Sequence, residues 1–240
     1  MGTVTKLSDK GVIKRGIITP DKHFPLHDEK AISVVCKAIR LIKPDFYVDL
    51  GDSGEFSSVS HWQWKKKKRP PLEYQLPRVY EDIGNVNAGM DIIDEALDKV
   101  NVKEKHFIEG NHEEWLNSFS IENPFLQGLS VKDALLLEQR GFEYHPNGKY
   151  LKIGKLWFYH GNHYGGIAHA RNHLIRLGAN IMYGHHHDLQ MASVTHIDGP
   201  KSAWSIGCLK DMSDEKNKWL GNRKTNWQHA FAVVDYFADG

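Results

Sequence analysis

The chain has 240 residues, of which 40% are hydrophobic and 25% are charged; this composition supports a sizeable core and excludes a disordered or fibrous protein. Its 31 basic and 30 acidic side chains leave a formal net charge of +1, so the molecule as a whole has no electrostatic attraction for a polyanion. Two cysteines are too few for a disulfide framework, and no apolar run reaches the roughly 18 residues that a membrane span needs. We therefore expect a globular cytoplasmic protein with no signal peptide and no membrane partner.

Apolar runs alternate with segments of helical spacing along the chain. In chain order, we expect a strand at residues 12–19, a helix at 28–42, a strand at 46–50, a helix at 88–100, a strand at 106–108, a helix at 131–139, strands at 150–153 and 156–159, a helix at 165–177, and strands at 179–183, 202–206 and 230–236. Strand–helix alternation followed by consecutive strands predicts an α/β architecture with one mixed sheet or two packed sheets. We expect a single domain over residues 1–240, with an elaborated loop or insertion around residues 54–77.

Histidine is unusually frequent, with 15 in the chain, and it is the commonest metal ligand in proteins. Several histidines belong to five polar blocks, each of which lies just beyond the carboxyl end of a predicted strand. The blocks are Asp21-Lys22-His23, Gly51-Asp52, Gly110-Asn111-His112-Glu113, His160-Gly161 and Gly184-His185-His186-His187. Ligands and catalytic groups collect at this end of the strands in α/β proteins, so these blocks are the candidate site.

The spacing within the blocks suggests metal chelation. Residues i and i+2 of an extended segment point the same way, so Asp21 and His23 are expected to chelate one ion together, and His185 and His187 likewise. The carboxylate of Asp52 has two oxygens and is able to bridge two cations. Carboxylate, imidazole and amide donors without a thiolate suit Mn, Fe, Zn, Ni or Co rather than a structural zinc.

Taken in order, the five blocks resemble the calcineurin-like metallophosphoesterase superfamily, whose pattern is D-x-H, GD, GNH[DE], H and GHxH. The matching blocks are short, but they extend from Asp21 to His187. The resemblance implies a four-layer α/β/β/α sandwich of two mixed β-sheets flanked by helices, and a site for two divalent metal ions. Mn²⁺ is the expected metal, with Fe, Zn, Ni and Co as alternatives. Small phage and bacterial phosphoesterases of this superfamily are nearest in size.

The resemblance also implies a role for each matching residue. One ion would be held by Asp21, His23, Asp52 and His187, and the other by Asp52, Asn111, His160 and His185. A hydroxide held between the ions would attack phosphorus, while His112 would bind the phosphate and protonate the leaving oxygen. Glu113 would orient or charge-stabilise His112 as a second catalytic residue. The expected substrate contacts are Asn111 and His112, together with His163, which matches no block but lies near the fourth.

The segment after Asp52 departs from one branch of the superfamily. It reads Ser53-Gly54-Glu55-Phe56 and lacks the V-D-R-G of protein Ser/Thr phosphatases, including their phosphate-binding arginine. We therefore predict a metal-dependent phosphodiesterase. The alternatives are a phosphomonoesterase or nucleotide pyrophosphatase at the same site and a non-catalytic scaffold that retained the fold.

A basic run from Lys65 to Arg69 is flanked by Trp62 and Trp64. Five consecutive cations beside two tryptophans fit a platform for single-stranded nucleic acid or a nucleotide. They fit equally well a solvated loop that its tryptophans anchor to the body of the protein, which is the interpretation we favour from sequence. The remaining candidates are interpreted in the same structural way, with Trp204, Trp219 and Trp227 as core or loop anchors and His169 and His173 in ordinary structural or surface roles on one helix.

Overall fold

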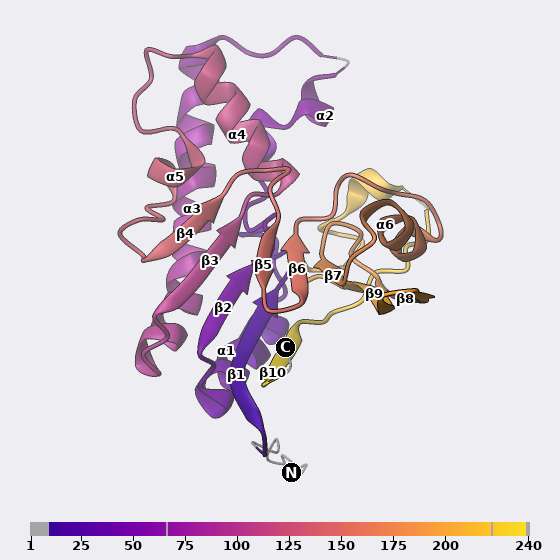
Figure 1. The fold of residues 1–240 in the computed structure, drawn as a ribbon. Helices are drawn as coiled ribbons and strands as arrows, with labels where there is room; N and C mark the ends of the chain where they lie inside the picture. The colour runs from indigo at the N-terminus through magenta and orange to yellow at the C-terminus, as the bar shows by residue number, and fades with distance from the viewer. Residues whose placement is uncertain (1–9, 66, 222, 239–240) are drawn as a thin grey trace.

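The computed structural model describes residues 10–65, 67–221 and 223–238 (Figure 1). Lys66 of the basic run lies outside the described residues.

Two five-stranded mixed sheets form the centre of the molecule. The first has the order β10-β1-β2-β3-β4, with β1 (Val12–Thr19), β2 (Phe46–Asp49), β3 (Glu104–Ile108), β4 (Phe142–His145) and β10 (Ala232–Phe237). The second has the order β5-β6-β7-β9-β8, with β5 (Leu151–Ile153), β6 (Leu156–Tyr159), β7 (Ile181–Tyr183), β8 (Leu189–His196) and β9 (Gly199–Ile206).

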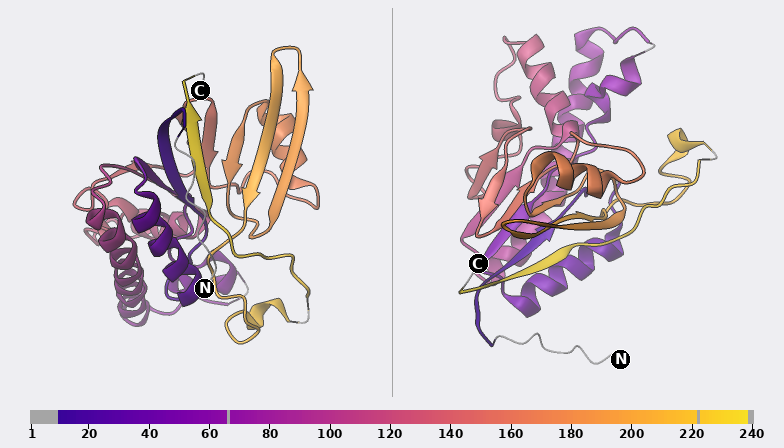
Figure 2. Two further views of the ribbon diagram at one scale, coloured as in Figure 1. Left: turned by 90° about the horizontal axis from the view of Figure 1, so that it is seen from below. Right: turned by 45° about the vertical axis from the view of Figure 1, so that its right-hand side comes forward.

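Helices cover the outer faces of the two sheets (Figure 2). The first sheet is covered by α1 (Glu29–Ile42), α3 (Leu72–Lys99), α4 (Asn111–Glu122) and the single turn α5 (Val131–Ala134). The second sheet is covered by α6 (His169–Leu177), which packs on β8 and β9. Three short helices, η1 (Ser57–Val59), α2 (His61–Trp64) and η2 (Lys218–Leu220), lie in the connecting segments. The predicted four-layer sandwich is confirmed.

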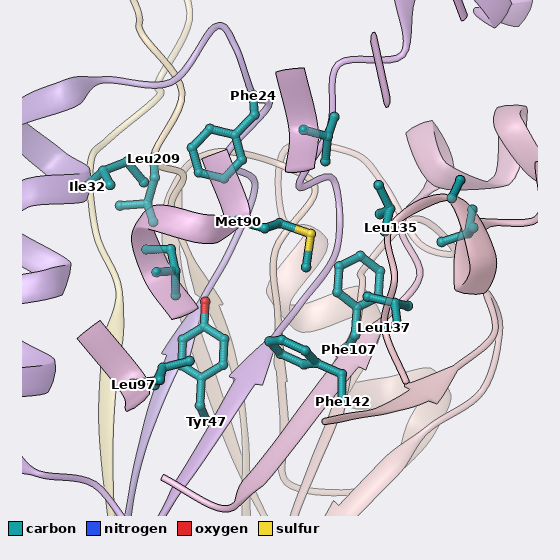
Figure 3. Packing of buried hydrophobic residues seen from close by; sticks show 14 of the residues in the cluster. Phe24, Ile32, Tyr47, Met90, Leu97, Phe107, Leu135, Leu137, Phe142 and Leu209 are labelled. Atoms are coloured by element: carbon teal, nitrogen blue, oxygen red, sulfur yellow. The ribbon is translucent and has the colours of Figure 1, made fainter. Parts of the chain in front are cut away.

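Three apolar clusters correspond to the three interfaces between these layers. The largest lies between the first sheet and its helices, where Tyr47 and Phe107 of the sheet meet Met90 and Leu97 of α3 (Figure 3). A second cluster, which includes Val48 and Phe158, fills the space between the two sheets. A third lies between the second sheet and α6. The central strands are therefore covered on both faces, which is why apolar residues follow one another directly in β2 and in the last part of β1 and β3.

The sequence-based elements differ from the structure mainly in the helices. The helix expected at residues 88–100 is the last part of α3, which begins at Leu72 and contains Pro77. Pro77 and Gly84 lower the helix propensity of this stretch, but packing against α1 stabilises the helix. The expected loop at residues 54–77 is therefore partly helical. The helix expected at 131–139 is only the turn α5, and the prediction omitted α4, β4 and β8.

No helix among the described residues is long and apolar enough to cross a membrane.

Candidate metal centre

The candidate site lies where strand ends from both sheets converge. In the first sheet β1, β2 and β3 are adjacent and parallel, so the segments that follow them emerge together. In the second sheet β6 and β7 are also adjacent and parallel. Two hydrogen bonds connect the two sets: His160 Nδ1 donates to the carbonyl of Leu50 at 2.9 Å, and the amide of His185 donates to Asp21 Oδ2 at 2.8 Å. All five polar blocks therefore meet at one end of the sandwich.

One group of side chains consists of Asp21, His23 and His187, which are all buried. The two imidazole Nε2 atoms of His23 and His187 lie 3.1 Å apart, and His187 Nε2 lies 3.3 Å from Asp21 Oδ1. Burial lowers the pKa of His23 to about 3, so its ring is neutral near pH 7. Neutral imidazole is the form that coordinates metal ions.

A second group consists of Asp52, His160 and His185, with Asn111 beside them. His160 Nε2 lies 3.0 Å from Asn111 Oδ1, 3.2 Å from His185 Nδ1 and 3.3 Å from Asp52 Oδ2. Burial lowers the pKa of His185 to about 3. Burial works against protonation of His160 as well, but the Asp52 carboxylate outweighs it and raises the pKa of His160 to about 10. A proton on His160 thus partly neutralises the Asp52 carboxylate, and a cation bound here would replace that proton.

Asp52 lies between the two groups. Its Oδ1 accepts a hydrogen bond from the amide of His112 at 2.9 Å, which fixes the plane of the carboxylate. Its Oδ2 lies 3.3 Å from His160 Nε2 and 3.9 Å from His23 Nε2, so one oxygen faces both sets of ring nitrogens. Burial would raise the pKa of Asp52, but the surrounding imidazoles, His160 and His112 first among them, hold it well below its usual range. Asp52 is therefore a carboxylate at neutral pH.

The extended conformation expected for the chelating pairs is wrong. Positive φ angles occur at Asp21 (37°), His23 (52°), Asp52 (47°), His185 (67°) and His187 (63°). Such angles cost roughly 1–2 kcal/mol at each non-glycine residue, and they cluster at functional sites. The chain turns at each of these residues, so His185 and His187 separate into different groups instead of chelating one ion together. Asp21 and His23 do share one group.

Two glycines permit the close approach of the carboxylates. A Cβ at Gly110 would lie 2.2 Å from Asp52 Oδ1, and a Cβ at Gly184 would lie 2.2 Å from Asp21 Oδ2. Either contact would displace a carboxylate that belongs to one of the groups. Gly110 and Gly184 are thus explained by the space that the two carboxylates need.

The donor set fits two divalent cations. Each group directs carboxylate oxygens and imidazole nitrogens toward one point, and within each group the candidate ligand atoms lie within 4.8 Å of one another. At neutral pH the two imidazoles whose pKa is lowered, those of His23 and His185, offer lone pairs rather than protons. Buried lone pairs at these separations repel one another unless a proton or cation lies between them. The groups coincide with the two ligand sets that the resemblance implies, with Asn111 next to the second.

The position of His112 differs from the expectation in one respect. Its Nδ1 donates to the backbone carbonyl of Glu55 at 2.7 Å, and its ring packs on Trp115 with centroids 4.0 Å apart. Its Nε2 lies 4.0 Å from Asp52 Oδ2, at the edge of the candidate centre. The Glu55 carbonyl and Trp115 therefore orient His112, whereas that role was expected of Glu113.

Glu113 instead holds the backbone of the second block. It is fully buried, and its carboxylate accepts hydrogen bonds from the amides of Gly110, Asp52, Ser53 and Gly54 at 2.8–3.0 Å. Burial and the Asp52 carboxylate raise the pKa of Glu113 to about 8, whereas the amide donors favour the charged form. A cation held by Asp52 would offset this repulsion. The expectation that Glu113 orients His112 is thus corrected to a positioning role beneath Asp52.

Replacing Glu113 with Gln is expected to destabilise the protein in EDTA at pH 9, above the pKa of Glu113, by about 2–4 kcal/mol, because the new amide group would face two buried backbone N–H donors. The free energy of unfolding is measured by urea denaturation. Glu114→Gln on the next, exposed position of α4 is the control and should change it by less than about 0.5 kcal/mol. A Glu113→Gln variant of wild-type stability that loses activity would restore the original role beside His112.

Two side chains near the centre were missed from the sequence. The Glu55 carboxylate lies 2.9 Å from His23 Nδ1 and 2.5 Å from Nζ of Lys210, which is itself buried. Burial alone would raise the pKa of Glu55, but His23 and Lys210 hold it below its usual range. A carboxylate on the second ring nitrogen fixes the orientation of a ligating histidine. The only sequence signal was the position of Glu55 soon after Asp52, and Lys210 lies far along the chain.

His163 is placed away from the site. It is exposed, its Nδ1 lies 3.3 Å from the hydroxyl of Tyr150, and it does not line the cleft described below. The expected substrate contact is therefore not supported by its position. His169 and His173 are buried as expected for structural residues: His169 bonds to Asp188 Oδ1 at 2.8 Å and to the hydroxyl of Tyr183 at 2.7 Å.

A cleft of about 770 Å³ opens over the two groups. His23, Asp52, Asn111, His112, His185 and His187 form part of its lining, and Trp62, Trp115, Trp219 and Trp227 form much of the rest. The loop-anchor interpretation is confirmed for Trp64, whose indole donates to the carbonyl of Ser58, and Trp204 packs against the core between the sheets. It is wrong for Trp219, which is 62% exposed, whereas Trp227 is half-buried and packs on the ring of His187 with centroids 4.6 Å apart.

Comparison with known proteins gives distant similarities. The chain is 24% identical over 237 residues to the Gene 54 protein of Mycobacterium phage L5, covering 92% of this chain and 88% of that protein. No family model matches the sequence. Among solved structures, a dimetal phosphatase from Danio rerio matches with a TM-score of 0.46 and 9% identity over 95% of this chain and 94% of that one. Vps29 from Entamoeba histolytica in complex with Zn²⁺ matches with a TM-score of 0.44 and 12% identity over 94% and 87%. At these levels the chemistry of the site has to be argued from its own residues.

Proposed function

We propose that this protein is a dinuclear metal-dependent phosphodiesterase of the calcineurin-like metallophosphoesterase type. The observation that carries the proposal is the position of Asp52, whose Oδ2 faces His160 Nε2 at 3.3 Å and His23 Nε2 at 3.9 Å. One carboxylate between two sets of oxygen and imidazole nitrogen donors is the arrangement that holds two cations side by side. Asp21 and His187 complete one set, and His185 and Asn111 complete the other.

The metals and the chain have separate tasks. Bound divalent cations, of which we propose Mn²⁺, would lower the pKa of bound water and neutralise phosphoryl oxygens. The carboxylates and imidazoles hold the cations, and Glu113 keeps the Asp52 backbone in place. The Glu55 carboxylate fixes His23. The chain thus supplies a preformed cradle that does not have to reorganise when substrate binds.

His112 would protonate the leaving oxygen. Its Nδ1–H is committed to the carbonyl of Glu55 at 2.7 Å, so Nε2 is the atom that faces the cleft. A proton on Nε2 can pass to the oxygen that departs from phosphorus, which matters most when that oxygen would otherwise leave as an alkoxide. The size of the cleft favours a diester, because the ester group that stays on phosphorus needs room and a volume of about 770 Å³ provides it.

Metal content and two chromogenic substrates test the proposal. The purified protein should bind close to two Mn²⁺ per chain and hydrolyse bis(p-nitrophenyl) phosphate with a higher kcat/KM than p-nitrophenyl phosphate. Faster monoester turnover would favour a phosphomonoesterase at the same site, and a nucleotide pyrophosphatase would prefer a dinucleoside or nucleoside diphosphate ester. A protein without bound metal and without activity after Mn²⁺ addition would be a scaffold that retained the fold.

We also propose that the protein resides in a reducing compartment such as the cytoplasm. Cys36 and Cys208 are both buried as free thiols, and burial raises the pKa of both. A protonated, buried thiol reacts slowly and behaves as a small apolar side chain.

A further inference from the structure

The cleft extends well beyond the candidate metal centre, and large aromatic side chains line its outer part. Trp62 on α2 is 66% exposed and Trp219 on η2 is 62% exposed, although both line the same cleft. They lie more than 150 residues apart in sequence. Exposed tryptophans concentrated at a concave site, rather than scattered over the surface, indicate a binding surface.

One wall of the outer cleft is built from the segment around α2. Trp62 and Gln63 line it, and Lys65 Nζ lies 4.8 Å above the centre of the Trp62 ring. Lys67 and Lys68 follow as exposed cations. The last member of the basic run, Arg69, pairs with Glu122 at 2.5 Å. The wall therefore combines an exposed aromatic ring, with Lys65 over one of its faces, and two further exposed cations, Lys67 and Lys68.

A second wall of the cleft is built from the segment before β10, with Trp219, Arg223 and Trp227 in its lining. Trp219 and Trp227 have ring centroids 6.1 Å apart, and the Arg223 guanidinium lies 5.7 Å from the Trp219 ring. Trp227 in turn lies 4.6 Å from the ring of His187, a member of the first group of the candidate centre. A continuous series of rings thus connects the cleft rim to the centre.

We propose that the two walls bind a single strand of nucleic acid across the candidate centre. Bases would stack on the free faces of Trp62 and Trp219, and the phosphates between them would lie near Lys65 and Arg223. This occupant is chosen because each wall pairs a ring with a cation, and a single strand alternates a flat base with a negative phosphate. A duplex hides its bases in the stack, and an uncharged sugar chain would leave the cations without partners.

The inference assigns the substrate class of the proposed phosphodiesterase and in that respect rests on it. Asp52 and His112 line the same cleft as Trp62 and Trp219, so a strand that contacts both tryptophans would pass close to them. The phosphodiester at that point would be the bond that is hydrolysed. The strand-binding surface itself uses residues outside the candidate metal centre, so it can be tested without metal.

Binding of a fluorescently labelled ten-nucleotide oligothymidylate, measured by anisotropy in EDTA, tests the two walls. Trp62→Ala and Trp219→Ala should each weaken binding by about tenfold, within the range that loss of one stacked base gives. Tyr80→Ala, at a 52% exposed aromatic on α3, is the control and should bind like the wild type. A parallel measurement with a ten-nucleotide oligouridylate compares the affinity for RNA with the affinity for DNA.

Two results would overturn the inference. One is unchanged affinity in both tryptophan variants, and the other is a ten-base-pair duplex that binds as tightly as the single strand, since either would leave only general electrostatic attraction. Hydrolysis of bis(p-nitrophenyl) phosphate by the wild-type protein with Mn²⁺ separates this inference from the proposed function. Tight strand binding without diester hydrolysis would refute the phosphodiesterase alone, and diester hydrolysis without strand binding would refute the inference alone.

Discussion

Replacing Asp52 with Asn is expected to remove both metal ions and to lower kcat/KM for bis(p-nitrophenyl) phosphate by at least about a thousandfold. The substitution removes the one negative charge that faces both groups. It also has a predictable orientation, because the backbone amide of His112 donates to Oδ1 at 2.9 Å and will select the oxygen of the new amide. The new NH₂ group then occupies the place of Oδ2 and points its hydrogens at His160 Nε2 and His23 Nε2. Metal content after dialysis and steady-state rates measure the two effects.

Asp214→Asn is the matched control, because Asp214 is an exposed acid outside the candidate centre. It should keep both metals and the wild-type rate. The proposed bridging position would be refuted by an Asp52→Asn protein that keeps two metals per chain and a rate within threefold of wild type. Loss of one metal only would assign Asp52 to a single cation.

The positions of the polar blocks were predictable from sequence because of how the central strands are buried. β1 and β2 are covered on both faces, so their sequences are short apolar runs whose ends are easy to locate. Polar residues directly after such runs, as at Asp21 and Asp52, must emerge at one edge of a parallel sheet. The second sheet could be placed in the same way from residues 156–159 and 179–183, although nothing in either run specifies that the two sheets face each other.

The contacts that complete the site depend on residues distant in sequence and were not predictable. The carboxylate of Glu113 binds the amides of residues 52–54, about sixty positions away, and no local pattern indicates this. His185 and His187 belong to different groups because of their positive φ angles, and only the surrounding structure imposes these angles. Trp219 was interpreted as an anchor because a lone tryptophan in a loop is usually one. Its position in the same cleft as Trp62 depends on the path of the segment before β10.

Replacing His112 with Ala is expected to leave both metals bound and to slow diesters with an alkyl leaving group by about 10²–10⁴-fold. The p-nitrophenolate of bis(p-nitrophenyl) phosphate leaves without a proton, so its hydrolysis should fall by only a few-fold. The physical reason is that Nε2 of His112 faces the cleft while Nδ1 is held by the Glu55 carbonyl. The measurement is the ratio of kcat/KM for the alkyl ester to that for the p-nitrophenyl ester, in wild type and variant.

The same experiment decides between two roles for this ring. His112, His23 and Glu55 also bring candidate ligand atoms within 4.8 Å of one another, so His112 as a metal ligand is the competing assignment. A ligand would show metal loss comparable with that of Asp52→Asn and an equal fall in rate on both esters, whereas a proton donor changes the ratio and spares the metal. His196→Ala, at an exposed position on β8, controls for removal of an imidazole as such and should change neither quantity. The dependence on the leaving group is therefore the quantity that identifies His112 as the acid.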